Sequence, residues 1–216
     1  QAIRWCRISQ DADIISLSLD ANPGRGMDDE SETTLAVQEA LDNGIFVVAA
    51  AGNTGLNEDI MDVSIPANIE GVISVAASDK NGNIWKNSAT GSSSDPYTGE
   101  ERLFPNQKPE ISAPGVRLYS TYSTESDSSL YAYSSGTSDS TVLVTGALAL
   151  ILEKYYEDIA GDDGKIDYSE ISRVKRALAN SAISDDQDSP HHFRKGYGKL
   201  NAISWAEEII IEFSIQ

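Results

Sequence analysis

The residues with the clearest chemical potential are Gly136-Thr137-Ser138, a small polar turn that leads into a long apolar stretch. Between Asp139 and Glu153 no residue is charged and most are apolar. This pattern predicts a helix that begins at Ser138 and is buried on most sides. The first turn of a helix presents unpaired amide donors and the positive end of the dipole, which favour developing negative charge. Ser138 is therefore either an N-cap or a nucleophile.

Gly146 falls inside this predicted helix, where glycine costs about 1 kcal/mol relative to alanine. Close approach of another backbone is the simplest reason for it. The complete pattern over residues 136–146, Gly-Thr-Ser-x-Ser-x-x-x-Val-x-Gly, resembles the nucleophile segment of subtilisin-like serine proteases, the subtilases. The resemblance implies that Ser138 is the nucleophile of a serine endopeptidase whose substrates are polypeptides.

Composition limits the classes of function. The chain has 216 residues, of which 40% are hydrophobic and 23% charged, as is typical of one globular domain. Its 34 acidic and 16 basic residues give a formal charge of −18, which disfavours nucleic acid and anionic membranes as partners. No apolar run approaches the roughly 18 residues of a membrane span, and no signal peptide stands at the start. The single cysteine, Cys6, excludes an internal disulfide.

The elements that must position Ser138 are predicted upstream of it. Strands are expected near residues 13–19, 45–51 and 71–77, because these runs are apolar without polar alternation, as in a parallel sheet covered on both faces. Ser31 or Thr33 is expected to cap a helix between the first two strands. Gly44 is expected to end that helix. Strand, helix and strand then form a βαβ unit.

These segments extend the resemblance to subtilases. In that family the first of these strands borders the substrate cleft, and an asparagine after a run of small residues donates a hydrogen bond to the oxyanion. Asn53 occupies that position after Ala50-Ala51-Gly52, although a turn residue is the other interpretation of Asn53. The resemblance thus implies catalytic roles for Ser138 and Asn53. It also implies that the substrate cleft is lined by Ser18, Leu19, Asp20, Ala50, Ala51 and Gly52.

Further landmarks of the family follow in its order, up to about residue 205. Pro66 stands where the family usually has a proline after a cis peptide, Ala113-Pro114-Gly115 resembles its strand end, and residues 195–202 resemble its glycine-rich closing segment. The resemblance implies a three-layer α/β subtilisin-like fold, with a mostly parallel sheet and helices on both faces. Residues 1–216 are expected to form a single partial domain that lacks its N-terminal part.

The missing part would contain the rest of the catalytic triad, whose chain order in subtilases is Asp, His, Ser. In the family the Asp and His motifs precede the strand that is expected here near residue 13. The two histidines of this chain, His191 and His192, follow the serine and read as surface loop residues. We therefore expect an N-terminal segment of the same protease or a partner chain to supply Asp and His. This chain alone is expected to be inactive, and its start at Gln1 indicates a processed or truncated product.

Two departures from the family pattern affect the expected activity. Asp139 stands where methionine is common, and Val142 replaces the usual proline. A carboxylate beside the nucleophile opposes the oxyanion unless it is itself paired, so a catalytically inactive subtilase-like structural or binding module is the alternative function. Asp20 replaces a glycine, and together with acidic residues 28–30 and 32 it predicts a preference for basic side chains near the scissile bond.

Two further interpretations concern residues after the central helix. An α/β-hydrolase esterase could use Ser138, Asp185 or Asp186, and His191, but Ser140 breaks the Gly-x-Ser-x-Gly motif of that fold. Residues 163–170 match the second half of a calcium-binding EF-hand loop, whereas the first half fails at Ile159 and Gly161. An acidic connection between helices, capped by Asp167 or Ser169, is the favoured interpretation, with Ca²⁺ as the other. No other metal is expected, and the location is expected to be secreted or cell-surface.

Overall fold

The computed structural model describes residues 1–19, 21, 31–57, 59–60, 62–95, 98–123, 130–184 and 189–214. Its centre is a four-stranded parallel sheet in the order β1-β2-β3-β4. The strands are β1 (Ile14–Leu17), β2 (Phe46–Ala50), β3 (Ile73–Ser78) and β4 (Ile111–Pro114). The predicted parallel sheet is confirmed, with strands close to the expected positions. An antiparallel hairpin, β5 (Val116–Thr121) and β6 (Tyr131–Ser135), follows β4.

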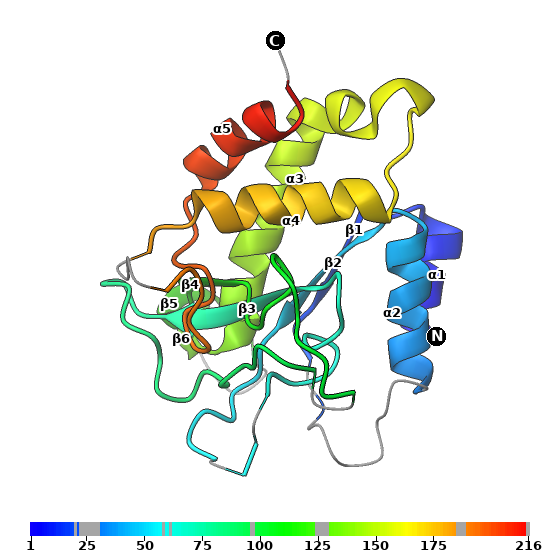
Figure 1. The fold of residues 1–216 in the computed structure, drawn as a ribbon. Helices are drawn as coiled ribbons and strands as arrows, with labels where there is room; N and C mark the ends of the chain where they lie inside the picture. The colour runs from blue at the N-terminus through cyan, green and yellow to red at the C-terminus, as the bar shows by residue number, and fades with distance from the viewer. Residues whose placement is uncertain are drawn as a thin grey trace.

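Helices cover both faces of this sheet, as expected (Figure 1). They are α1 (Ala2–Gln10), α2 (Glu32–Asp42), α3 (Thr137–Ala160), α4 (Tyr168–Ser181) and α5 (Ala202–Glu212), with the short 3₁₀ helix η1 (Gly161–Asp163) after α3. All residues of β2 and β3 are buried, which requires cover on both sides. Over the described residues, no helix combines the length and apolar character needed to cross a bilayer.

Local signals explain where the elements begin and end. Ser31 caps α2 by accepting a hydrogen bond from the Thr34 amide, as predicted. Gly44 ends the turn after α2 at a φ of 76°, and a Cβ there would fall 1.9 Å from the carbonyl oxygen of Ile166. Only glycine suits both the conformation and the space. The peptide between Ile65 and Pro66 is cis, which confirms the prediction made for Pro66.

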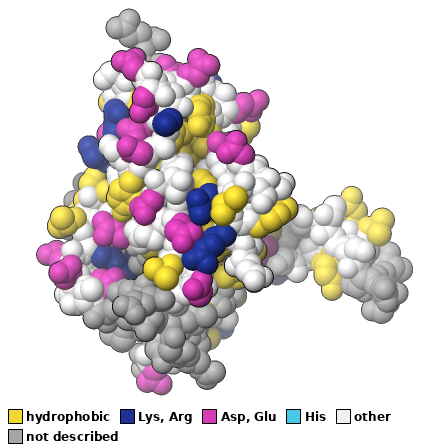
Figure 2. All heavy atoms as spheres, turned by 90° about the vertical axis from the view of Figure 1, so that its right-hand side faces the viewer, with side chains coloured by type: hydrophobic (Ala, Val, Ile, Leu, Met, Phe, Trp, Pro, Cys, Tyr) yellow, Lys and Arg dark blue, Asp and Glu magenta, His cyan; other side chains and the backbone are white. Residues whose placement is uncertain are grey.

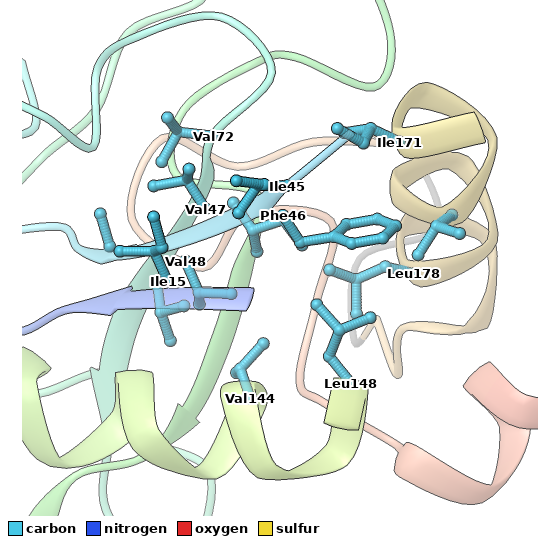
Figure 3. Close-up of a cluster of buried hydrophobic side chains, with 14 of the residues drawn as sticks. Ile15, Ile45, Phe46, Val47, Val48, Val72, Val144, Leu148, Ile171 and Leu178 are labelled. Carbon is cyan, nitrogen blue, oxygen red and sulfur yellow. The ribbon is translucent and has the colours of Figure 1, made fainter. Parts of the chain in front are cut away.

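The core lies between α3 and the sheet and extends to α4. Figure 3 shows Val144 and Leu148 of α3 pointing at the strands, while the ring of Phe46 reaches toward Leu178 of α4. All four side chains are almost completely buried. Burial of each such side chain stabilises the fold by about 1.5–3 kcal/mol relative to leaving it exposed.

The helix predicted from Ser138 onward is present as α3, but it is not buried on most sides. Val142, Leu143 and Leu150 are exposed, so α3 buries a single face. The predicted close approach at Gly146 is also wrong, because a Cβ there would have no neighbour within 4 Å. Sequence alone did not distinguish the two faces of α3, since both are apolar.

A buried cluster of charges joins α4 to the sheet. The Oε1 atom of Glu110 accepts hydrogen bonds of 2.8 Å from both Lys108 and Lys175, and its Oε2 atom accepts one from the Ser74 amide. Both lysines also donate to the carbonyl oxygen of Val72. Burial lowers the pKa of Lys108 to about 7 although Glu110 opposes the shift. Burial alone would raise the pKa of Glu110, but the two ammonium groups outweigh it and lower that pKa.

Candidate active site

The start of α3 is held against the carboxyl end of β4. Ser140 donates a hydrogen bond of 2.9 Å to the Ala113 carbonyl, and the Gly136 amide donates one of 2.8 Å to the Gly115 carbonyl. A Cβ on Gly115 would fall 2.0 Å from Ser140 Oγ and 2.7 Å from the Gly136 oxygen. Glycine at position 115 therefore permits the close approach that fixes the turn before Ser138.

Ser138 lies beside the predicted cleft strand. Its hydroxyl is 3.5 Å from the carbonyl oxygen of Ser18, and the hydroxyl of Ser18 donates to the Ser138 carbonyl at 3.2 Å. About two turns further along α3, Thr145 donates to Ser16 Oγ at 3.0 Å. The nucleophile candidate is thus half-buried at the carboxyl end of the parallel sheet, where ligands bind in open α/β folds.

Asn53 follows β2 and reaches the same turn. Its Oδ1 atom accepts hydrogen bonds from the amide of Thr137 at 3.0 Å and from the Thr137 hydroxyl at 3.1 Å. Because an amide N–H can only donate, the oxygen of the Asn53 side chain must face Thr137. The Nδ2 group therefore points away from Thr137, on the side of Gly136.

Gly136 leaves a space between two donors. A Cβ built on this residue would lie 3.7 Å from Asn53 Nδ2 and 3.7 Å from the Ser138 amide nitrogen. The amide of Ser138 belongs to the first turn of α3, where helix geometry offers no intrahelical acceptor. Two potential donor nitrogens from different segments thus lie at the same distance from one point next to Gly136. Such a point suits an oxyanion.

The other predicted cleft residues differ in exposure. Ser18 and Leu19 are exposed, whereas Ala50, Ala51 and Gly52 are buried beneath the turn that carries Asn53. The Gly52 amide donates to the Thr137 hydroxyl at 3.2 Å, so these small residues support the turn from below. Asp20 and acidic residues 28–30, predicted to make the cleft edge acidic, lie outside the described residues.

A carboxylate borders the same space. Asp139 Oδ2 accepts a hydrogen bond of 2.9 Å from the hydroxyl of Ser134 and lies 3.6 Å from the position of a Cβ on Gly136. A carboxylate oxygen therefore lies as near to this point as the two donor nitrogens do. The sequence singled out Asp139 but did not identify Ser134 as its partner. Ser134 lies near the end of β6, and the turn before α3 separates it from Asp139.

Sequence reasoning also missed Thr137. This residue orients the Asn53 side chain through its amide and its hydroxyl, and its hydroxyl also accepts from Gly52. Its only sequence signal is its place between the glycine and the serine of the motif.

The two histidines lie elsewhere. His191 Nε2 is hydrogen-bonded to the Pro109 carbonyl at 2.9 Å, and its ring packs edge-on against Tyr197. Pro109 precedes β4, so His191 sits at the amino end of the strand, whereas Ser138 lies at the carboxyl end. Burial lowers the pKa of His191. The esterase interpretation with His191 as the base is therefore wrong, and its acid candidates, Asp185 and Asp186, lie outside the described residues.

The acidic connection after α3 uses carboxylates to bind backbone amides. Asp167 caps α4 in a capping box with Glu170, which confirms the favoured interpretation. Asp163 accepts from the Lys165 amide. Asp163 and Asp167 thus bind different backbone amides. Nowhere in the part of the chain that the structure describes do three His, Cys, Asp or Glu side chains form a group that could hold a metal ion.

The fold is that of α/β proteases of known structure. The chain superposes on the structure of the prenylagaramide maturation protease PagA with a TM-score of 0.69 and 27% identity, covering 96% of this chain and 65% of PagA. The self-cleaved protease domain of PatA, 23% identical, has the same fold with a TM-score of 0.67 over 98% of this chain and 66% of its own. The subtilase family model matches residues 1–198. The chain therefore belongs to the subtilase family.

Sequence relatives agree with this assignment. Subtilisin DY of Bacillus licheniformis is 39% identical over 143 residues, which cover 66% of this chain and 43% of that protein. Serine protease AprX of Bacillus subtilis is 31% identical over an alignment that covers 94% of this chain and 46% of AprX. The chain thus spans less than half the length of these relatives.

Proposed function

We propose that this chain supplies the nucleophile, Ser138, and the oxyanion donor, Asn53, of a serine endopeptidase that cleaves polypeptides. An N-terminal segment of the same protease, or a partner chain, supplies the Asp and His of the triad. The observation that carries the proposal is that Asn53 Nδ2 and the Ser138 amide nitrogen both lie 3.7 Å from the position of a Cβ on Gly136, next to Ser138 in the chain.

The chemistry follows from this geometry. A histidine brought in by the other segment removes the hydroxyl proton of Ser138, and the oxygen attacks the carbonyl carbon of the scissile peptide. The carbonyl electron pair moves onto its oxygen, which lies between the Asn53 amide and the Ser138 N–H. Each such donor typically lowers the barrier by about 2.7–4 kcal/mol. Thr137 contributes by holding the Asn53 amide in the donating orientation.

The surface next to Ser138 supports a missing segment. On its outer side β1 has no strand neighbour among the described residues, and a parallel edge strand presents unpaired amides and carbonyls. The adjacent face of α3 exposes Val142, Leu143 and Leu150, and Gly146 lies there with open space above it. A strand added to β1 and an element packed over α3 would bury both.

Fluorophosphonate labelling tests the proposal. Residues 1–216 alone should show no triad-type peptidase activity, because the residual catalysis of an oxyanion hole and binding is only about 10³–10⁴-fold over water. Adding the N-terminal segment in trans should produce labelling, and Ser138→Ala should abolish it. Efficient hydrolysis by residues 1–216 that survives Ser138→Ala would place the active site elsewhere.

A catalytically inactive subtilase-like module is the second candidate, and the carboxylate of Asp139 beside the oxyanion space favours it. A well-folded complex with the N-terminal segment that remains unlabelled would support this candidate over the peptidase.

For the peptidase, we further propose a preference for basic side chains near the scissile bond, which rests on the acidic residues that follow Leu19 in the sequence. Peptides scanned across positions near the cleavage point test it. Equal cleavage with and without Lys or Arg would refute it.

A further inference from the structure

The hairpin β5–β6 carries a face of tyrosines that the candidate active site does not use. Tyr119 pairs with Tyr133 across the two strands, and Thr121 pairs with Tyr131, so the three tyrosines share one face of the ribbon. The ring of Tyr119 stacks on Tyr131 at 5.4 Å and lies tilted against Tyr133 at 5.0 Å. The guanidinium of Arg117 lies 5.4 Å from the ring centre of Tyr133. We call Arg117, Tyr119, Tyr131 and Tyr133 the tyrosine platform.

The platform is open to solvent. Although the rings touch one another, Tyr119 is 63% exposed, Tyr131 49% and Tyr133 65%. In Figure 2 the hairpin is the arm that projects from the body, with hydrophobic side chains along it. Tyrosine has a large rigid ring with a polar end, which makes it abundant in binding surfaces and unusual as an exposed cluster on a free surface.

The platform is continuous with the proposed nucleophile. Strand β6 ends at Ser135, and only Gly136 and Thr137 separate it from Ser138. The cleft residues Ser18 and Leu19 follow β1, at one edge of the sheet, whereas the hairpin follows β4 at the opposite edge. Ser138 therefore lies between the cleft strand and the platform.

This order determines which part of a substrate can reach the platform. A polypeptide whose acyl side lies along Ser18 and Leu19 carries its leaving-group side past Ser138 toward β6. At about 3.3 Å per extended residue, the tyrosines are reached about three to five residues beyond the scissile bond. The described residues of the hairpin carry one charge, that of Arg117, so apolar and aromatic contacts dominate there.

We propose that the tyrosine platform binds the leaving-group side of the polypeptide substrate through proline or aromatic residues. This inference rests on the proposed function. Proline and aromatic rings stack on exposed tyrosine faces, and extended proline-containing segments lose little entropy when they bind. The platform thereby selects substrates by residues outside the reacting centre and aligns them across Ser138.

The test measures binding by the full-length protein carrying Ser138→Ala. The probes are three fluorescein-labelled Gly/Ser peptides with one central Lys. One has Pro-Pro-Tyr about three to five residues after the Lys, one has it the same distance before, and one lacks it. We expect binding about fivefold tighter for the first peptide than for the other two. Tyr133→Thr should remove this gain and keep a strand-forming residue, whereas Tyr133→Phe should retain it.

Tyr122 provides a matched control. It is 49% exposed on the same hairpin, and its position alternates with Tyr119, so it lies on the opposite face. Tyr122→Thr should leave all three affinities unchanged. Equal binding of the three peptides, or a gain that survives Tyr133→Thr, would overturn the inference.

The remaining outcomes are also distinguishable. If Tyr133→Thr changes the sedimentation coefficient but no peptide affinity, the platform joins two copies of the chain and the inference fails. Because the Ser138→Ala protein reports binding alone, a failure of fluorophosphonate labelling in the unmutated protein would remove the peptidase assignment without altering this readout.

Discussion

The hydroxyl of Ser134 donates a hydrogen bond of 2.9 Å to Asp139 Oδ2, and this bond holds the carboxylate beside the space that Gly136 leaves open. An oxyanion formed there would meet a negative charge. Two unit charges about 6 Å apart interact by on the order of 2–3 kcal/mol at an effective dielectric constant near 20. Asp139 would therefore slow the proposed reaction at Ser138 unless a basic group of the substrate or of the proposed N-terminal segment neutralises it.

We predict that Asp139→Asn accelerates fluorophosphonate labelling of Ser138 by about 30- to 150-fold in the complete protease, because the side chain keeps its acceptor for Ser134 and loses its charge. The labelling rate measured at saturating N-terminal segment checks this. Ser134→Ala is the control, since it retains the charge and should give no acceleration. An unchanged rate in Asp139→Asn would mean that the carboxylate is already neutralised.

Gly136→Ala should block the oxyanion space without unfolding the chain. The new Cβ would lie 3.7 Å from Asn53 Nδ2 and from the Ser138 amide nitrogen, which is ordinary contact, and the φ of 175° is extended backbone open to any residue. We expect labelling to fall by about 10²-fold, the effect of losing an oxyanion donor. A thermal melt should show at most a small loss, about 0.5–1 kcal/mol from the weaker N-cap. Unimpaired labelling would show that the oxyanion forms elsewhere.

Gly146→Ala should stabilise the isolated chain by up to about 1 kcal/mol, because alanine favours a helix interior and meets no neighbour there. If the N-terminal segment packs over this face of α3, the same variant should weaken its association. Denaturant unfolding and a pull-down with the tagged segment separate the two effects. Association at unchanged strength would place the segment away from Gly146.

Gly115→Ala should destabilise the chain, in contrast to Gly146→Ala. Its Cβ would overlap Ser140 Oγ, so we expect a loss of about 1–3 kcal/mol or more in the free energy of unfolding. Stability equal to that of the parent chain would contradict the close packing at the start of α3.

Stability should fall as the pH drops through the range in which histidine titrates. Burial lowers the pKa of His191 below its ordinary value of 6.5. The unfolded chain therefore takes up a proton first, and the stability contributed by the neutral ring is present above 6.5 and lost as the pH falls below it. His191→Gln keeps a donor for the Pro109 carbonyl and does not titrate. Between about pH 5 and 8, the free energy of unfolding should depend less on pH for this variant than for the parent chain. If the free energy of unfolding changed with pH equally in the two proteins, the pH dependence could not be assigned to His191.

The features that sequence predicted best depend on short stretches of chain. Ser31 and Asp167 cap their helices through bonds to residues two or three positions away. The apolar runs near 45–51 and 71–77 indicate strands because they lack polar alternation, as is typical of a parallel sheet covered on both faces. Ser138 and Asn53 became candidate site residues in the same way, since each belongs to a motif of adjacent residues. The geometry that joins them, through Thr137, depends on the distance between β2 and α3 and has no local signal.

The main feature that the sequence failed to predict is which face of α3 is buried. Val142 and Leu150 are as apolar as Val144 and Leu148, and only the packing partners of the helix decide which side is covered. The cluster of Lys108, Glu110 and Lys175 was likewise beyond sequence reasoning. Charged side chains are almost never fully buried unless paired, and the pairing here connects β4 with a helix far along the chain.

The cluster of Lys108, Glu110 and Lys175 also allows local unfolding of the protein to be measured by chemical modification of its lysines. Lys108 and Lys175 have no exposed side-chain surface, whereas Lys80 and Lys165 are exposed. An acylating reagent added to the folded protein will therefore modify the exposed amines and spare these two. Once α4 separates from β4, both buried amines become reactive together. Mass spectrometry of the peptides that contain them would record how often this part of the molecule opens, with no added probe.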